Sequence, residues 1–242
     1  MNVLVVLGHP EPKSFNAALC AAAKKTLEAQ GHAVRVSDLY AQGFKSEVTW
    51  ADFKTRRHPD MLRIIREQGN AWKTDGFVDE IKREIENISW ADFVIVQCPI
   101  WWFGLPAIVK GWMDRVFVPG FTYGRGKWYE TGGLAGKRAM MSITFDAKAS
   151  AYTPRGRYGD ADIMLWPIHT SLRFVGFDVL RPFVSDQVSE SADARAKSLA
   201  DFEARLKTIG DETPMFFHTL DEFDENDMLK PGVKGRTVAQ RD

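Results

Sequence analysis

The sequence lacks the features that mark several large classes of protein. Its 242 residues include only two cysteines, Cys20 and Cys98, which are too few for a disulfide framework and favour a reducing, cytoplasmic setting. Because 32 basic and 32 acidic residues leave no net charge, neither nucleic acid nor an anionic membrane is expected as a main partner. The apolar runs are too short for a signal peptide or a transmembrane helix, so we expect no stable membrane insertion.

Several catalytic motifs are also missing. The first apolar run is followed by Gly8-His9-Pro10-Glu11 and not by GxGxxG, which disfavours a classical dinucleotide-binding Rossmann site. The chain contains no Walker A, HExxH or GxSxG motif. Its five histidines and two cysteines are dispersed, so we expect no metal site.

Short apolar segments alternate with helical patterns along the chain. Strands are expected at 3–7, 33–39, 92–99, 137–144 and 177–185, and helices at 15–30, 61–68, 77–88, 106–118, 162–175 and 191–209. Strands that are apolar on both faces belong to a parallel sheet covered by helices. We therefore predict an α/β fold with a doubly wound, five-stranded parallel sheet in the flavodoxin-like order 2-1-3-4-5. Residues 1–210 should form one domain and residues 211–242 a C-terminal extension.

The order of the strands predicts where a ligand binds. In this topology the site lies beyond the carboxyl ends of the first and third strands. The loop after the first strand ends at Ser14, where a helix begins, and the free N–H groups of such a helix attract phosphate. Ser14 could equally be a plain helix cap. His9 could hydrogen-bond a phosphate or merely fix the loop.

The other two loops at this edge carry aromatic residues. Trp101, Trp102 and Phe103 follow the third strand and are costly to expose, so they should contact a planar ligand, contact another subunit, or pack beneath the glycine-rich segment 120–136. The loop after the fourth strand holds Tyr152 and Tyr158. A Tyr hydroxyl can donate a proton or stabilise negative charge, although this loop could also be only a solvated basic one.

Together these segments resemble one enzyme family. The resemblance rests on Gly8-His9, Ser14-Phe15-Asn16, Ser37-Asp38-Leu39-Tyr40, Pro99-Ile100-Trp101-Trp102-Phe103-Gly104-Leu105-Pro106, Lys110-Gly111-Trp112, Leu165-Trp166-Pro167-Ile168 and Asp211-Glu212-Thr213-Pro214. In these segments the chain is similar to the NAD(P)H:quinone oxidoreductase (DT-diaphorase) family. The resemblance implies a homodimeric flavoprotein that uses FAD, with FMN less expected. NAD(P)H would reduce the flavin, and a quinone or other small planar acceptor would then take two electrons in a ping-pong reaction.

The same resemblance implies roles for individual residues. It assigns Tyr152 and Tyr158 to catalysis. The cofactor would be bound by His9, Ser14, Phe15, Asn16, Ala17, Arg63, Pro99, Ile100, Trp101, Trp102, Phe103, Thr144, Phe145, Asp146, Ala147 and Arg195. The acceptor would contact Trp102, Phe103, Tyr123, Arg125 and Phe174, with Tyr123 reaching in from the second subunit.

The chain departs from the family pattern at several of these positions. Tyr158 replaces a His, Asp146-Ala147 replaces a Gly pair, Trp101 replaces a Gln, and Arg125 replaces a Tyr. Acceptor preference is therefore open, and a flavin reductase for azo or nitro compounds is an alternative. A second alternative is a flavodoxin-fold regulatory subunit of a potassium efflux system.

Overall fold

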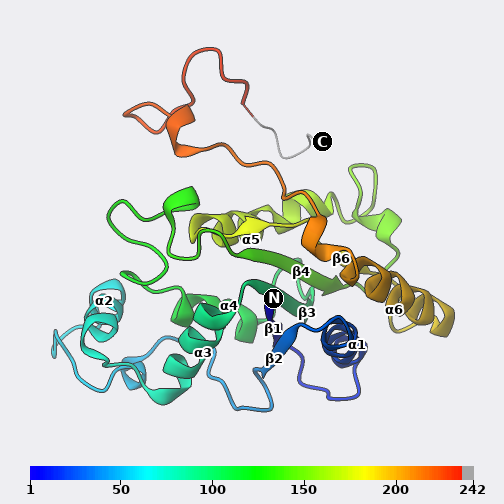
Figure 1. The fold of residues 1–242 in the computed structure, drawn as a ribbon, viewed down its shortest axis with the longest axis horizontal. Helices are drawn as coiled ribbons and strands as arrows, with labels where there is room; N and C mark the ends of the chain where they lie inside the picture. Colours follow the sequence, from blue (N-terminus) through cyan, green and yellow to red (C-terminus); the bar gives the residue numbers. More distant parts are fainter. Residues whose placement is uncertain (236–242) are drawn as a thin grey trace.

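A parallel β-sheet with helices on both faces organises the protein (Figure 1). The computed structural model describes residues 1–235. Its strands are β1 (Asn2–Leu7), β2 (Ala33–Asp38), β3 (Phe93–Pro99), β4 (Arg138–Thr144), β5 (Asp178–Val179) and β6 (Phe183–Ser185). Five of them run in the order β2-β1-β3-β4-β5, and every pairing is parallel. The predicted fold class and strand order are confirmed.

The strand predicted at 177–185 carries Pro182, which the sequence predicts to interrupt it, and the structure divides it there into two. Two short strands, β5 and β6, both pair with β4, at its beginning and its end respectively. Pro182 lies between them and has no N–H to donate to a ladder. The sheet therefore has a sixth strand among the described residues.

The helices occupy nearly the predicted segments. They are α1 (Phe15–Ala29), α2 (Ile64–Thr74), α3 (Asp79–Trp90), α4 (Ala107–Val116), α5 (Ala161–Phe174) and α6 (Ala192–Leu206). Short 3-10 turns occur at Trp50–Asp52, Tyr129–Thr131, Ala149–Tyr152, Ile209–Asp211 and Leu220–Glu222. The helix expected at 61–68 starts later and is longer, and α5 begins close to its predicted start with Pro167 inside it. Within residues 1–235, none of the helices has the length and apolar character needed to cross a bilayer.

Alternate side chains of the central strands enter two hydrophobic cores. Val3, Val5 and Leu7 of β1 are buried with α1 and α6, which pack against each other. Leu4 and Val6 face the opposite way, into a core shared with α3, α4 and α5. Because helices cover both faces, the carboxyl ends of the strands are left as the place where loops can form a site.

The segment after α6 extends across the end of the sheet next to α5 and appears at the top of Figure 1. Its path is fixed near β5 by the backbone N–H of Met215, which donates to the carbonyl of Val179 at 2.7 Å. The rings of Phe217 and Trp166 of α5 stack with centroids 5.3 Å apart. The described part of the extension is thus attached to the α/β domain.

A single glycine allows α4 to approach the segment before η1 (Trp50–Asp52). A Cβ atom on Gly111 would lie 1.9 Å from the carbonyl oxygen of Ser46, closer than any real contact. We expect Gly111→Ala to lower the free energy of unfolding by about 2–4 kcal/mol, because rigid backbone has to move. Urea denaturation measures this change. The matched control is Gly210→Ala, since a Cβ there meets no atom within 4 Å; equal losses in the two variants would contradict the packing argument.

Candidate cofactor site and neighbouring cavities

A cavity of about 480 Å³ opens where β1, β3 and β4 end, and we call it the strand-end cavity. It is lined by His9, Ser14, Phe15, Asn16, Pro99, Ile100, Trp101, Thr144, Phe145, Asp146, Val188 and Ser189. All of these except Val188 and Ser189 were predicted from the sequence. The three loops expected to converge at the switch in strand order do converge there.

The first side of the strand-end cavity is the N-terminus of α1. Ser14 is its N-cap, and the Ser14 Oγ accepts a hydrogen bond from the Ala17 N–H at 3.1 Å. The N–H groups of Phe15 and Asn16 lie in the first turn, where a helix provides no carbonyl partner. This end of the helix therefore combines a partial positive charge with free donors, which suits a phosphate group. The Ala17 N–H is already occupied by the cap.

His9 both fixes the loop and keeps a donor for a ligand. Its Nδ1 accepts a hydrogen bond from the Glu11 N–H at 3.0 Å. In the neutral ring the hydrogen must then be on Nε2, which can donate to an anion. The two roles considered for His9 are compatible.

A buried network of amides supports the floor of the strand-end cavity. The Asn16 Nδ2 donates to Thr144 Oγ1 at 3.0 Å, and the Gln97 Nε2 donates to Asn16 Oδ1 at 2.9 Å. All three side chains are almost fully buried. The Asn16 side chain is thus used inside the protein, and its backbone N–H is the group offered to a ligand. Gln97 was missed, although a polar residue in the apolar strand 92–99 is a signal for such a network.

We expect Asn16→Ala to lower the free energy of unfolding by about 1–3 kcal/mol, because buried polar atoms of Gln97 and Thr144 lose their partners. Thermal or urea denaturation of the protein measures the loss. Gln30→Ala, at the exposed opposite end of α1, is the control and should have little effect. A similar stability for both variants would show that the network contributes nothing.

The aromatic turn after β3 has a strained backbone. Trp101 and Gly104 exchange two backbone hydrogen bonds of 3.0 and 3.1 Å, so Trp102 and Phe103 occupy the centre of a tight turn. Both have positive φ, 51° and 61°, which is uncommon and unfavourable for bulky residues. The turn exposes Trp102 almost completely, at 95%. Trp102 therefore does not pack beneath segment 120–136, and its ring is available to a ligand or a second subunit.

Tyr152 packs against Phe145, which lines the strand-end cavity. The two rings stack with centroids 3.9 Å apart at an angle of 16°. The ring of Tyr158 is 5.2 Å from that of Tyr152 and 6.0 Å from that of Phe103. Burial, together with the charges of Tyr158 and Asp146, raises the pKa of Tyr152 above its ordinary value. Its hydroxyl consequently remains a donor at neutral pH.

Arg195 acts on the strand-end cavity from α6. Its Nη1 donates to the Val188 carbonyl at 2.8 Å, which holds the loop that carries Val188 and Ser189. Ala147 follows the lining residue Asp146 and is half-buried. Arg195 therefore supports, from outside the strand-end cavity, the loop of Val188 and Ser189 that forms one of its walls.

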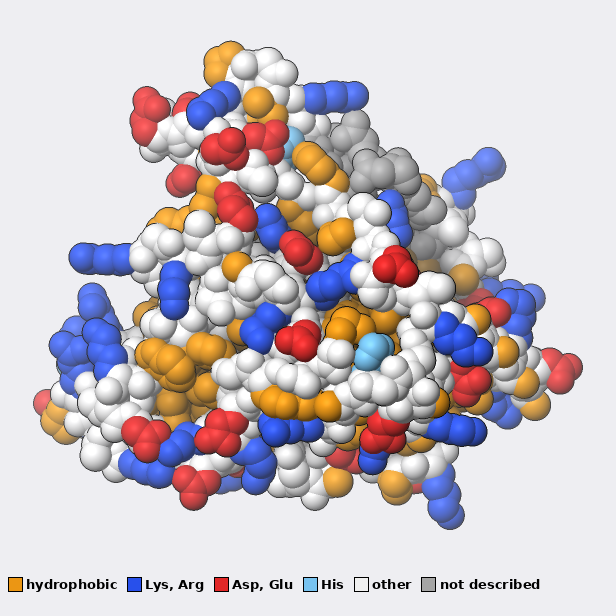
Figure 2. Space-filling view, viewed as in Figure 1, with side chains coloured by type: hydrophobic (Ala, Val, Ile, Leu, Met, Phe, Trp, Pro, Cys, Tyr) orange, Lys and Arg blue, Asp and Glu red, His pale blue; other side chains and the backbone are white. Residues whose placement is uncertain are grey.

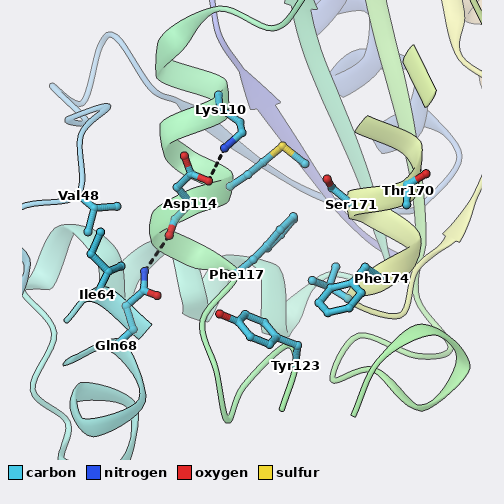
Figure 3. Close-up of a pocket in the computed structure, with 12 residues that line it drawn as sticks. Val48, Ile64, Gln68, Lys110, Asp114, Phe117, Tyr123, Thr170, Ser171 and Phe174 are labelled. Atoms are coloured by element: carbon cyan, nitrogen blue, oxygen red, sulfur yellow. Dashed lines mark hydrogen bonds and ion pairs between the residues drawn. The ribbon is translucent and has the colours of Figure 1, made fainter. Parts of the chain in front are cut away.

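Two further predicted residues, Tyr123 and Phe174, line a second cavity of about 570 Å³, the helix cavity, between α4 and α5 (Figure 3). Tyr123, Phe117 and Phe174 gather on one side of it, and the rings of Tyr123 and Phe174 are 5.7 Å apart. Burial raises the pKa of Tyr123. Arg63 and Arg125, predicted to contact the cofactor and the acceptor, are exposed and line neither of these two cavities. Within one chain, the helix cavity shares none of its lining residues with the strand-end cavity.

Known proteins are similar to this chain over most of its length. The model of a family described as having a flavodoxin-like fold matches residues 1–209. NAD(P)H dehydrogenase (quinone) 1 of Cavia porcellus is 38% identical over 228 residues, which cover 93% of this chain and 83% of that protein. Ribosyldihydronicotinamide dehydrogenase (quinone) of Mus musculus is 40% identical, covering 88% of this chain and 94% of that protein.

Solved structures agree with the sequence relatives. A Klebsiella pneumoniae protein described as a candidate quinone reductase superposes with a TM-score of 0.91 at 35% identity, covering 98% of each chain. An azoreductase from Bacillus anthracis is only 13% identical at a TM-score of 0.60, which shows a shared fold and no more. The chain therefore belongs to the flavodoxin-like family and, within it, to the NAD(P)H:quinone oxidoreductases.

Proposed function

We propose that this protein is a flavin-dependent NAD(P)H:quinone oxidoreductase that transfers two electrons by a ping-pong mechanism. The strand-end cavity carries this proposal, because a helix N-terminus, an imidazole donor and aromatic side chains converge there. The quinone reductases among the relatives support the same reaction.

The residues of the strand-end cavity fit a flavin nucleotide. The phosphates would be held by the first turn of α1 and by the Nε2 of His9. The backbone of Pro99, Ile100 and Trp101 and that of Thr144, Phe145 and Asp146 would hold the ring. We favour FAD over FMN, since Arg195 supports a further wall of the cavity beside Val188 and Ser189.

During the proposed reaction, the chain's own residues would bind the flavin and stabilise the negative charge that develops beside it. A bound flavin supplies a centre that accepts a hydride from NAD(P)H and later reduces the quinone. The Tyr152 hydroxyl, which stays protonated at neutral pH, can donate a hydrogen bond to negative charge that develops beside it. Tyr158, in ring contact with Tyr152 and Phe103, can relay this hydrogen bonding.

A homodimer would complete the acceptor pocket. Tyr123 and Phe174 lie at the helix cavity, apart from the strand-end cavity of their own chain. We propose that they reach the strand-end cavity of the second subunit, where Trp102 and Phe103 are exposed. Residues 1–210 would form the flavin-binding domain and 211–242 an extension, and the buried free thiols of Cys20 and Cys98 suit the cytoplasm.

The absorbance spectrum of the purified protein tests the flavin directly, and extraction identifies it as FAD or FMN. After reconstitution with FAD, NADH or NADPH should be oxidised when a simple quinone is added, and initial rates should give the parallel lines of a ping-pong reaction. A protein that binds no flavin and oxidises neither nucleotide would overturn the proposal. Reduction of azo dyes without reduction of quinones would reassign the acceptor.

A further inference from the structure

The loop between β4 and α5 concentrates positive charge beside the strand-end cavity. Residues 147–159, which we call the basic loop, include Lys148, Arg155 and Arg157 and no acidic residue, in a chain whose net charge is zero. All three cations are exposed. Figure 2 shows Lys and Arg side chains projecting at the upper right of the molecule, where this loop lies in Figure 1. The basic loop therefore favours an anion on this side of the cavity.

The shape of the basic loop is fixed by its own backbone. The Tyr158 N–H donates to the Ala151 carbonyl at 2.9 Å, and the Gly156 N–H donates to the Thr153 carbonyl at 2.8 Å. A Cβ on Gly156 would lie 2.3 Å from the Ala151 carbonyl oxygen, so a glycine is needed where the chain folds back on the 3-10 turn Ala149–Tyr152. Because this backbone is already folded, a ligand would not have to order it.

Arg155 and Arg157 lie on either side of that glycine and are free to bind a ligand. Within residues 1–235, neither side chain forms an ion pair or a hydrogen bond. The Asp160 carboxylate caps the first turn of α5, and Asp186 accepts a hydrogen bond from the Ala149 N–H at 2.7 Å. These two carboxylates thus serve backbone N–H groups and pair with neither arginine.

The basic loop is separate from the site proposed for the flavin phosphates. Those phosphates are assigned to the loop after β1 and the first turn of α1, whereas the basic loop follows β4 and the proposed ring contact Asp146. Within the basic loop, the ring of Tyr158 lies 6.0 Å from that of Phe103 in the aromatic turn. An anion on the basic loop would therefore belong to a second molecule that reaches the flavin ring, which in the proposed reaction is NAD(P)H.

We propose that Arg155 and Arg157 bind the 2′-phosphate of NADPH and so make NADPH the preferred reductant over NADH. The two nucleotides differ only by this phosphate, a monoester that carries about 1.5 to 2 negative charges at neutral pH. Guanidinium groups bind phosphate oxygens through paired N–H donors, and two of them balance a dianion. This inference rests on the proposed function and specifies the reducing substrate of the same site.

The rate of reaction with each nucleotide tests this preference. With the FAD-loaded protein and a simple quinone, we expect kcat/KM for NADPH to exceed that for NADH about tenfold, and added salt should diminish the difference. Arg155→Gln combined with Arg157→Gln should remove most of the preference. Arg83→Gln, which removes an exposed arginine of α3, is the control and should leave both values unchanged.

Two kinetic results would contradict the proposal. The first is an equal kcat/KM for NADPH and NADH in the unmodified protein. The second is an equal loss for both nucleotides in the double variant, because the arginines would then bind the diphosphate that the two nucleotides share.

A binding measurement separates failure of this proposal from failure of the proposed function. Adenosine 2′,5′-bisphosphate and 5′-AMP differ by the 2′-phosphate alone and lack a nicotinamide, so calorimetric titration of the purified full chain needs no turnover. We expect the bisphosphate to bind about tenfold more tightly, and the double variant, shown by thermal melting to be folded, to lose this difference. A bisphosphate that binds no more tightly than 5′-AMP overturns the proposal, even in a protein that reduces quinones. A clear advantage in a protein that oxidises neither nucleotide supports the 2′-phosphate site and overturns the proposed reaction alone.

Discussion

Under the proposed function, replacing Tyr152 with Phe should slow NAD(P)H-dependent reduction of a bound flavin by about 10²-fold, the lower range for loss of a positioned acid. The stacking of this ring on Phe145, at 3.9 Å, does not need the hydroxyl and should survive the change. Flavin content should therefore remain normal while the rate falls. Stopped-flow measurement of flavin absorbance after mixing with NADPH separates these two quantities.

The pH dependence of the rate of flavin reduction is a second test of the role of the Tyr152 hydroxyl. Because burial raises its pKa above the ordinary value near 10, the hydroxyl donates throughout the neutral range and loses its proton only at strongly alkaline pH. The rate of the unmodified protein should thus decline at that end, and the Tyr152→Phe variant should lack this decline.

Tyr158→Phe is the matched control for Tyr152→Phe. Tyr158 is in the same ring cluster but is more exposed and does not stack on Phe145. We expect its loss to have a smaller effect than the loss of the Tyr152 hydroxyl. Equal rates for the unmodified protein and Tyr152→Phe would remove Tyr152 from the mechanism. If the protein were instead a regulatory subunit of the same fold, binding of its partner should not depend on the Tyr152 hydroxyl.

The parts that could be predicted from the sequence depend on local patterns. The run Val3–Leu7 and the cap at Ser14 are each visible within a few residues, and topology then places their loops together. The aromatic turn was located in the same way. The positive φ angles of Trp102 and Phe103, within the turn closed by the hydrogen bonds between Trp101 and Gly104, were not predicted, because bulky residues seldom adopt them.

The parts that could not be predicted depend on residues far apart in the chain. Gln97 contacts Asn16 across 81 positions, and Val188 reaches the strand-end cavity from the loop that follows β6. Val48 and Phe174, far apart in the sequence, likewise line different sides of the helix cavity (Figure 3). Such contacts depend on how whole helices and strands pack together, so no pattern within a short stretch of sequence predicts them.

The second large effect is expected from Arg115, a fully buried residue of α4. Its guanidinium forms two hydrogen bonds of 3.0 and 3.2 Å to the buried Asp52 carboxylate. It also donates to Glu80 and, at 2.7 Å, to the Lys45 carbonyl, so it joins α3, α4 and the segment before η1. We expect Arg115→Met to lower the free energy of unfolding by about 3–5 kcal/mol, because an uncompensated charge remains buried. Urea denaturation at neutral pH measures the loss.

The pH at which Arg115→Met is measured should change the size of this loss. Burial raises the pKa of Asp52, and the hydrogen bonds and charge of Arg115 oppose that rise. Without Arg115 the folded-state pKa moves further above the unfolded value, so the folded state favours the protonated acid. The penalty should therefore shrink as pH falls towards the unfolded pKa near 4 and grow as pH rises.

Adding Asp52→Asn to Arg115→Met separates the buried charge from the lost packing. The double variant has no carboxylate at position 52, so it should recover much of the stability of the single variant, and the part of the pH dependence that comes from Asp52 should vanish. Arg115 also lies over the ring of Phe44 at 4.6 Å, and the loss of this contact should remain in both variants. If the double variant is no more stable than Arg115→Met, the stability comes from packing of the arginine and not from its pairing with Asp52.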